Sequence, residues 1–222
     1  MKKGMSLKNA KRIWKKVWYF IWEDDSWLSW AVNVILAFVL IKFIIYPILG
    51  LILSTSYPIV AVVSGSMEHD GNFDQWWESG AYCDSLSQNT ITVCNQELHY
   101  SKYEITKEQF KEYRYKNGFN KGDIMLIYGS APEKLKQGDV LVFEAGKSNP
   151  IIHRIVKVNE YSDSVESQIT FTTKGDHNPT SSNFEKQISS DFVIGKAVFR
   201  IPYLGYIKIW FVEGLQKIGI IK

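Results

Sequence analysis

The stretch PIIHRIVKV (150–158) repeats β-branched residues at close spacing around one histidine, and it gives the main indication of the fold class of this part of the chain. Such an alternation indicates a β-strand with one buried face. Similar β-branched or aromatic runs stand on both sides, with Gly, Asn, Asp, Ser or Pro between them. These runs are PIVAVV (58–63), DIMLIY (123–128), DVLVFEA (139–145), QITFTTK (168–174) and FVIGKAVFRI (192–201). Their spacing predicts a mainly β domain of antiparallel strands over residues 55–206.

Upstream of this domain, residues 30–53 read WAVNVILAFVLIKFIIYPILGLIL, a run long enough to cross a bilayer as a helix. Lys42 opposes insertion by roughly 2.5–3.5 kcal/mol. Fifteen Val, Ile, Leu and Phe residues between positions 34 and 53 favour insertion by roughly 4–9 kcal/mol in total. We therefore predict a transmembrane helix over residues 30–54; the alternative is a buried helix of a soluble protein.

Basic residues gather before this span, although the net charge of the chain is only +3. Seven of the 26 Lys and Arg residues lie in the first sixteen positions, and Trp14, Trp18 and Trp22 recur among them at every fourth residue. The spacing predicts an interfacial amphipathic helix within residues 1–29. A basic arm can also bind nucleic acid, but the span that follows favours the bilayer as partner, so no nucleic acid is expected. The positive-inside rule places this segment in the cytoplasm and the β domain outside the cell membrane, on a single-pass anchor.

The segment of about residues 69–120 has no clean strand period and is predicted to be an insertion into the β domain. It holds both cysteines, Cys83 and Cys94. Outside the cytoplasm such a pair favours a disulfide over two free thiols. A metal site with His99 fits less well because the spacing matches no common ligand pattern, so no metal is expected. Thr106 is expected to cap a short helix that follows it.

The C-terminal segment 207–222 has its apolar residues at helical spacing. They are Ile207, Trp210, Phe211, Leu215 and Ile218. The segment is too short and too charged for a second span. It predicts an amphipathic helix, lying either on the bilayer surface or on the β domain.

Three polar residues at strand ends are candidates for chemistry. Ser66 follows the first β run in SGSME, between Gly65 and Met67. A serine is a weak nucleophile unless a base removes its proton and a further group orients that base. His153, within a strand, is either a core histidine or such a base. Asp176, in TTKGDHNP, is either a turn residue or the group that orients an imidazole.

In this order and behind a membrane anchor, these segments resemble type I signal peptidases of the archaeal and endoplasmic-reticulum branch. The matching stretches cover the β domain except for the insertion. They are SYPIVAVVSGSMEHD, KGDIMLI, GDVLVFEAG, PIIHRIVKV, TTKGDHNP and GKAVFRIPYLGYIKI. The resemblance implies a membrane-anchored serine endopeptidase without a cofactor. Its substrates would be the signal peptides of exported preproteins, and accessory subunits occur in some relatives.

The resemblance also implies roles for single residues. Ser66 would attack the scissile carbonyl, and His153 stands where bacterial relatives carry a lysine base. Asp176 would orient His153, while the Ser64 hydroxyl and the Ser66 N–H would form the oxyanion hole. An extended substrate with small side chains would contact the residues around the serine. These are Val62, Val63, Gly65 and Met67.

The chain departs from the family pattern at two positions. A second aspartate usually stands six residues after Asp176, but here this position is Ser182. Either Asp176 takes the whole role, or Glu185 or Asp191 does. His69 replaces a usual proline, and we expect it to be a surface residue. The missing carboxylate keeps a non-catalytic alternative open: a membrane-tethered β module that binds peptides or partner proteins.

Overall fold

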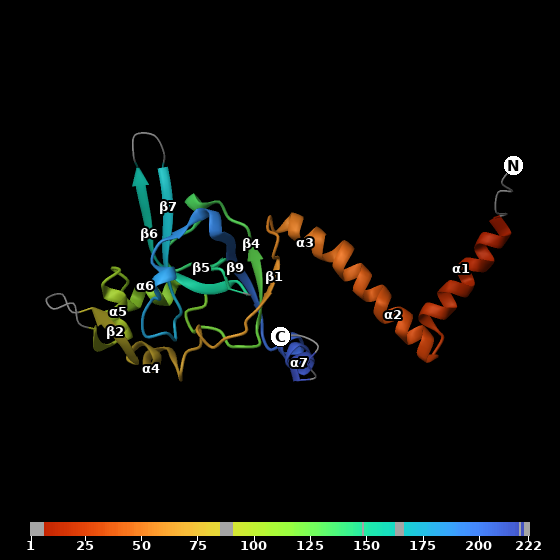
Figure 1. Ribbon diagram of the computed structural model, residues 1–222, viewed down its shortest axis with the longest axis horizontal. Helices are drawn as coiled ribbons and strands as arrows, with labels where there is room; N and C mark the ends of the chain where they lie inside the picture. Colours follow the sequence, from red (N-terminus) through yellow and green to blue (C-terminus); the bar gives the residue numbers. More distant parts are fainter. Residues whose placement is uncertain (1–6, 85–90, 148, 163–166, 218, 220–222) are drawn as a thin grey trace. The chain divides into compact units, whose positions relative to one another are not determined.

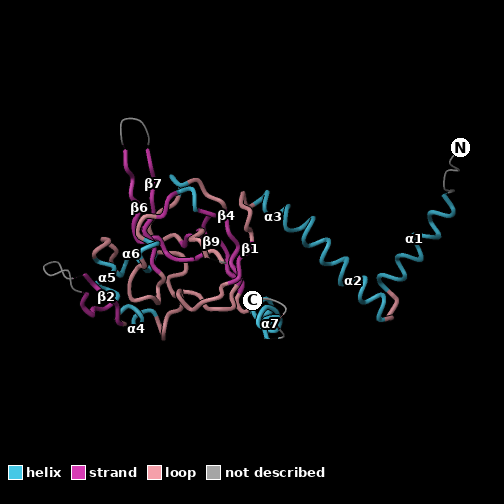
Figure 2. The backbone as a smooth tube through the Cα atoms, in the orientation of Figure 1, coloured by secondary structure: helices cyan, strands magenta, loops and turns pink. Residues whose placement is uncertain are grey.

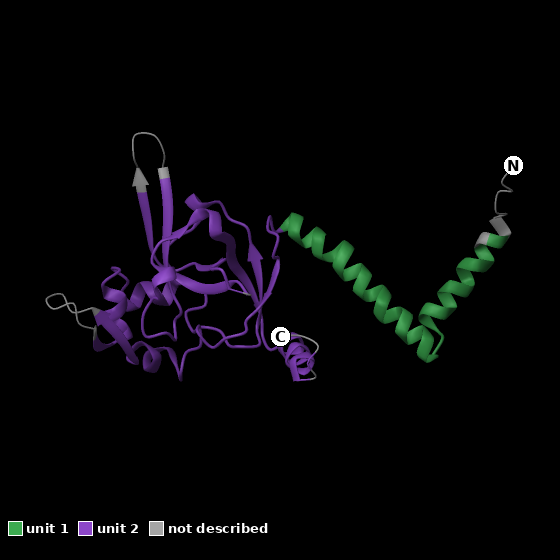
Figure 3. Cartoon of the chain, viewed as in Figure 1, with its two compact units in different colours: residues 1–52 green, residues 53–222 purple. Residues whose placement is uncertain are grey.

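The computed structural model describes residues 7–84, 91–147, 149–162, 167–217 and 219 of the 222-residue chain. The chain forms two compact units, Met1–Ile52 and Leu53–Lys222, which Figure 3 colours separately.

The first unit is helical. The helix α1 (Leu7–Trp22) precedes a continuous helical run made of α2 (Trp27–Leu40), the π-helical turn η1 (Ile41–Ile45) and α3 (Tyr46–Ile52). This run has 26 residues with a hydropathy of 2.6, so its length and composition suffice to cross a membrane. It begins earlier than the predicted residue 30 because the side chain of Ser26 caps it.

The tryptophans of α1 form a row, as their spacing predicts. The ring centroids of Trp14 and Trp18 lie 6.5 Å apart, and those of Trp18 and Trp22 lie 5.7 Å apart. Asn33 of α2 donates a hydrogen bond of 2.8 Å from Nδ2 to the carbonyl oxygen of Ile21. This bond ties the end of α1 to the following helix.

The second unit is built on an antiparallel sheet whose described strands follow the order β1-β4-β9-β5-β6-β7-β8 (Figure 1). The mainly β prediction is therefore confirmed. The strands are β1 (Ile59–Ala61), β4 (Ile124–Tyr128), β5 (Val140–Phe143), β6 (Ile151–Ser162), β7 (Ser167–Lys174), β8 (Ile188–Ser189) and β9 (Val193–Ile201). Short 3₁₀ turns connect some of them: η2 (Pro132–Lys134), η3 (Asn183–Glu185) and η4 (Ser190–Phe192).

Strand β5 lies centrally between β9 and β6, and all four of its residues are buried. Alternate residues of a strand point to opposite faces. Val140 and Val142 therefore join one core cluster, and Leu141 and Phe143 join another. With both of its faces covered, the centre of the sheet is a rigid support for the strand β6 beside it.

The inserted segment 69–120 is a small packed body of its own, drawn near β2 and α4 in Figure 2. Its elements are α4 (Phe73–Trp77), β2 (Gly80–Asp84), β3 (Ile91–Asn95), α5 (Gln96–Ser101) and α6 (Lys107–Glu112). As predicted, Thr106 caps α6, because its hydroxyl accepts a hydrogen bond from Gln109 N. An aromatic cluster packs the segment against Val156 of β6. Its inserted members are Trp76, Trp77, Tyr100, Ile105 and Phe110.

Cys83 of β2 and Cys94 of β3 form a disulfide, as the sequence analysis favoured. Replacing both cysteines with serine is expected to lower the free energy of unfolding by about 2–3 kcal/mol, because the bond restricts the unfolded chain. Thermal unfolding of the parent and the double variant measures this, and reductant should lower the melting temperature of the parent alone. Equal melting temperatures under oxidising conditions would contradict a stabilising role.

The C-terminal helix α7 (Tyr206–Lys217) covers most of the predicted segment 207–222, of which residues 218 and 220–222, Ile218 among them, lie outside the described residues. Ile209 is buried, whereas the side chains of Ile207, Trp210 and Phe211 are exposed. The helix thus packs on the β domain through one side and keeps an apolar side free. A role at the bilayer surface remains a prediction for that free side.

Candidate active site

Ser66 lies on a segment whose backbone is held at both ends. Before it, Val62 N donates to Asp123 O and Gly122 N donates to Val62 O, both at 2.8 Å. At the serine itself, His177 N donates a hydrogen bond of 2.9 Å to Ser66 O. These bonds fix the backbone, so the hydroxyl is presented from a constant position on the segment that follows β1.

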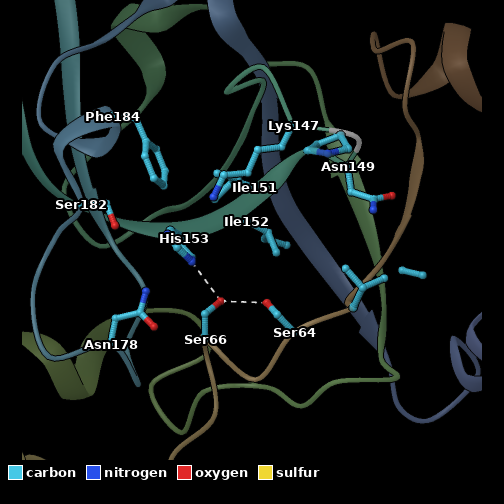
Figure 4. Close-up of a pocket in the computed structure, with 13 residues that line it drawn as sticks. Ser64, Ser66, Lys147, Asn149, Ile151, Ile152, His153, Asn178, Ser182 and Phe184 are labelled. Atoms are coloured by element: carbon cyan, nitrogen blue, oxygen red, sulfur yellow. Dashed lines mark hydrogen bonds between the residues drawn. The ribbon is translucent and has the colours of Figure 1, made fainter. Parts of the chain in front are cut away.

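His153 reaches this hydroxyl from strand β6 (Figure 4). It pairs with Leu141 of the buried strand β5. Its Nε2 lies 2.9 Å from Ser66 Oγ, and its Nδ1 lies 2.5 Å from Glu185 Oε1. The imidazole therefore stands between a hydroxyl and a carboxylate, which is the arrangement that a general base needs.

Glu185 ends the turn η3, and its side chain is fully buried. Burial raises the pKa of this carboxyl, but hydrogen bonds from His153, Ser182 N and Thr173 outweigh burial and lower it below its usual value. Ser182 N donates to Glu185 Oε2 at 2.8 Å, and Thr173 Oγ1 donates to Glu185 Oε1 at 3.2 Å. The backbone of Ser182 thus helps to hold an ionised glutamate in contact with the histidine.

A pocket of 380 Å³ opens at the Ser66 hydroxyl, between the segment that follows β1 and the start of β6. Ser64 Oγ lies 3.2 Å from Ser66 Oγ inside it. The wall is partly apolar and partly polar, as Figure 4 shows. Apart from the serines and His153, its lining includes Ala61, Val63, Lys147, Ile151, Asn178 and Phe184. The described residues contain no cluster of His, Cys, Asp and Glu that could hold a metal ion.

No family model matches the chain, but comparison with known proteins finds similar sequences. Signal peptidase complex catalytic subunit SEC11C of Homo sapiens is 29% identical over 97 residues, which are 41% of this chain and 49% of the relative. Subunit SEC11 of Plasmodium falciparum is 29% identical over 102 residues, with 43% and 53% covered. Subunit SEC11 of Lodderomyces elongisporus is 33% identical over 98 residues, with 41% and 56% covered.

This chain is related to signal peptidase catalytic subunits. The relatives support the resemblance to type I signal peptidases of the endoplasmic-reticulum and archaeal branch. The chain spans about half the length of the curated relatives that it matches.

Asp176 differs from the role that the signal peptidase resemblance implied for it. Its buried carboxylate accepts hydrogen bonds from Arg154 Nη2 at 2.6 Å, from His69 Nε2 at 3.1 Å and from the Tyr100 hydroxyl at 3.1 Å. Burial raises its pKa, but Arg154 and His69 outweigh burial and hold the pKa well below the usual range. Arg154 follows His153 on β6 and points to the opposite face, so it draws Asp176 away from the imidazole.

The carboxylate at His153 is instead Glu185, one of the two alternative acids named from the sequence. Asp191, the other alternative, is exposed on η4. The alternation along β6 indicates that Arg154 lies on the face opposite to His153. A guanidinium buried there requires a carboxylate partner. No sequence pattern placed Glu185.

Two of the expected substrate contacts differ as well. The side chains of Val62 and Met67 are buried in the hydrophobic core, so they do not line the pocket. Val63 is exposed and lines it. A Cβ on Gly65 would lie 2.9 Å from Glu68 Oε2. Gly65 therefore leaves room for the Glu68 side chain.

His69 is also not the surface residue that we expected, because its side chain is only 2% exposed. Its ring stacks on Trp76 with centroids 3.7 Å apart. The pocket residues that were not predicted as site residues include Lys147, Asn178 and Phe184. Asn178 lies within the motif TTKGDHNP, whereas no motif marked Lys147 or Phe184.

Proposed function

We propose that this chain is a membrane-anchored serine endopeptidase that removes N-terminal signal peptides from exported preproteins. The observation that carries the proposal is the contact of 2.9 Å between Ser66 Oγ and His153 Nε2, with Glu185 on the other ring nitrogen. The related catalytic subunits support the same function.

In this mechanism His153 takes the proton of Ser66 while the serine oxygen attacks the scissile carbonyl. Glu185 accepts a hydrogen bond from Nδ1, so it keeps the tautomer in which Nε2 is free and stabilises the imidazolium that forms. The imidazolium then gives the proton to the departing amine. Water attacks the acyl-enzyme in the same manner and releases the signal peptide.

The tetrahedral intermediate carries a negative charge that needs donors. The Ser66 N–H and the Ser64 hydroxyl are the candidates, because the Ser64 oxygen already lies 3.2 Å from the nucleophile. Donors aimed at developing charge stabilise the transition state without reorganising.

The substrate is proposed to bind as an extended strand. Strand β1 is an edge of the described sheet, and Ala61 and Val63 lead from it into the pocket. An exposed edge offers backbone hydrogen bonds to a peptide, and the pocket then selects alternate side chains. The limited volume favours small side chains next to the cut.

The anchor fits a substrate that is itself held in the bilayer. Residues 53–65 separate the apolar helix from Ser66, at most roughly 45 Å when fully extended. We propose a single-pass topology in the cell membrane with the N-terminus in the cytoplasm. The relatives are catalytic subunits of a complex, so partner subunits are part of the proposal.

The function is tested by incubating the full-length chain in liposomes with a labelled preprotein and locating the cut by mass spectrometry. We expect one cut behind a small side chain. A matched preprotein with tryptophan at that position should be cleaved at least 10-fold more slowly, because the pocket cannot admit the ring. If the chain binds the preprotein but yields no cleaved product, both in liposomes and in membranes of the cells that produce the chain, the non-catalytic β module would be favoured.

A further inference from the structure

Lys174 is a fully buried cation that the mechanism above does not use. It is the last residue of β7, and the loop 175–185 that carries Glu185 follows it directly. Its Nζ donates to Gln96 Oε1 at 2.9 Å, to Gly175 O at 3.1 Å and to Asp176 O at 3.2 Å. A buried ammonium is tolerated when its donors are paired, and here each of the three has an acceptor.

The backbone that Lys174 holds lies against both reacting groups. A Cβ built on Gly175 would lie 2.7 Å from Ser66 O and 2.9 Å from His153 Nε2. Two residues later, His177 N donates to Ser66 O at 2.9 Å. Any shift of this turn would therefore change the distance between the serine and the histidine.

The third acceptor, Gln96, belongs to the inserted segment. It is itself buried, and its backbone N–H donates to Ser79 O at 2.9 Å within that segment. Other inserted residues bind the same loop: Trp76 Nε1 donates to Asp176 O at 3.2 Å, and Tyr82 N donates to Pro179 O at 2.8 Å. The insertion thus contacts the first half of the loop, at Asp176 and Pro179.

We propose that Lys174 and Gln96 are positioning residues through which the inserted segment holds the loop 175–185 in its catalytic geometry. The inference rests on the proposed peptidase function for its kinetic consequences. It assigns the insertion a role in the reaction and not only in the fold.

The charge of Lys174 makes this role measurable. Burial lowers the pKa of Lys174 to about 7, with Asp176 and Glu185 raising it and Lys102 and Arg154 lowering it. The Tyr100 ring also faces the ammonium, at 5.1 Å. As pH rises through this value, the Lys174 ammonium loses a proton and keeps only two N–H donors. One of its three acceptors then has no hydrogen bond from Lys174. We therefore expect kcat to fall on the alkaline side.

The test compares pH profiles of kcat for the parent, Gln96→Glu and Gln96→Leu. Gln96→Glu places a carboxylate beside the ammonium, so the pH at which kcat falls on the alkaline side should rise by at least one unit. Gln96→Leu removes the acceptor, so this pH should be lower than in the parent and kcat itself should fall about 10-fold. KM should change less than twofold, because neither residue lines the pocket.

Gln109→Glu is the matched control. It makes the same substitution in the same segment at the cap of α6, and it should leave the profile unchanged. If kcat falls at the same alkaline pH in the parent and in both Gln96 variants, the inference is overturned. A folded Lys174→Met variant should show no such alkaline fall.

Hydrogen exchange separates this inference from the proposed function. Gln96→Leu should speed exchange of the His177 amide relative to Gln109→Glu, whether or not a preprotein is cleaved. If the parent does not cleave the preprotein but Gln96→Leu still exchanges faster, only the proposed peptidase function would be refuted. Unchanged exchange would refute the positioning role.

Discussion

Replacing Ser66 with alanine is expected to reduce preprotein cleavage by on the order of 10⁴-fold or more, and His153→Ala should cost about as much. The two groups act in one step, the transfer of the serine proton across 2.9 Å. The double variant should therefore be no slower than either single variant, because effects within such a unit do not add. Single-turnover assays with excess enzyme measure these rates.

Ser64→Ala is the matched control for this pair. It removes one hydroxyl of the same pocket but leaves the nucleophile and the base in place, so a loss of roughly 10²–10³-fold is expected for one oxyanion donor. Unchanged melting temperatures would show that all the variants fold. Cleavage by His153→Ala at the parent rate would refute the assignment of the base.

The features that could be predicted from the sequence depend on local periodicity. The runs 58–63 and 150–158 both contain a strand, because alternation reports a buried face without knowledge of the partner strand. Their bounds differ, since β1 covers only Ile59–Ala61 and β6 continues to Ser162. His153 lies on β6, whereas Ser66 lies on the segment that follows β1. Their contact, across 87 positions of sequence, follows from the sheet order rather than from either motif.

The acid could not be predicted in the same way. Asp176 and Glu185 lie on one irregular loop, and the choice between them depends on which face of β6 each reaches. Arg154 and His69 bind Asp176 on one face of β6. The turn η3 places Glu185 on the other face, beside His153. His69 itself is covered by aromatic side chains of the insertion, whose packing has no sequence period.

The two carboxylates of this loop are expected to separate in a matched pair of substitutions. Glu185→Gln should lower kcat by on the order of 10⁴-fold, because an amide does not keep the histidine in its working tautomer. Its melting temperature should change little. Asp176→Asn should instead lower the free energy of unfolding by about 3–5 kcal/mol, because it leaves Arg154 buried without a counter-charge.

The pH dependence of stability distinguishes the same two residues. The pKa of Asp176 is lowered in the folded state, so its stabilisation is present above the unfolded carboxyl value of about 4 and is lost as pH falls towards the folded value. Asp176→Asn should therefore unfold with a flatter acid dependence than the parent. If Asp176→Asn abolished cleavage at an unchanged melting temperature while Glu185→Gln cleaved normally, Asp176 would be the orienting acid, and the contact between Glu185 and His153 would be structural.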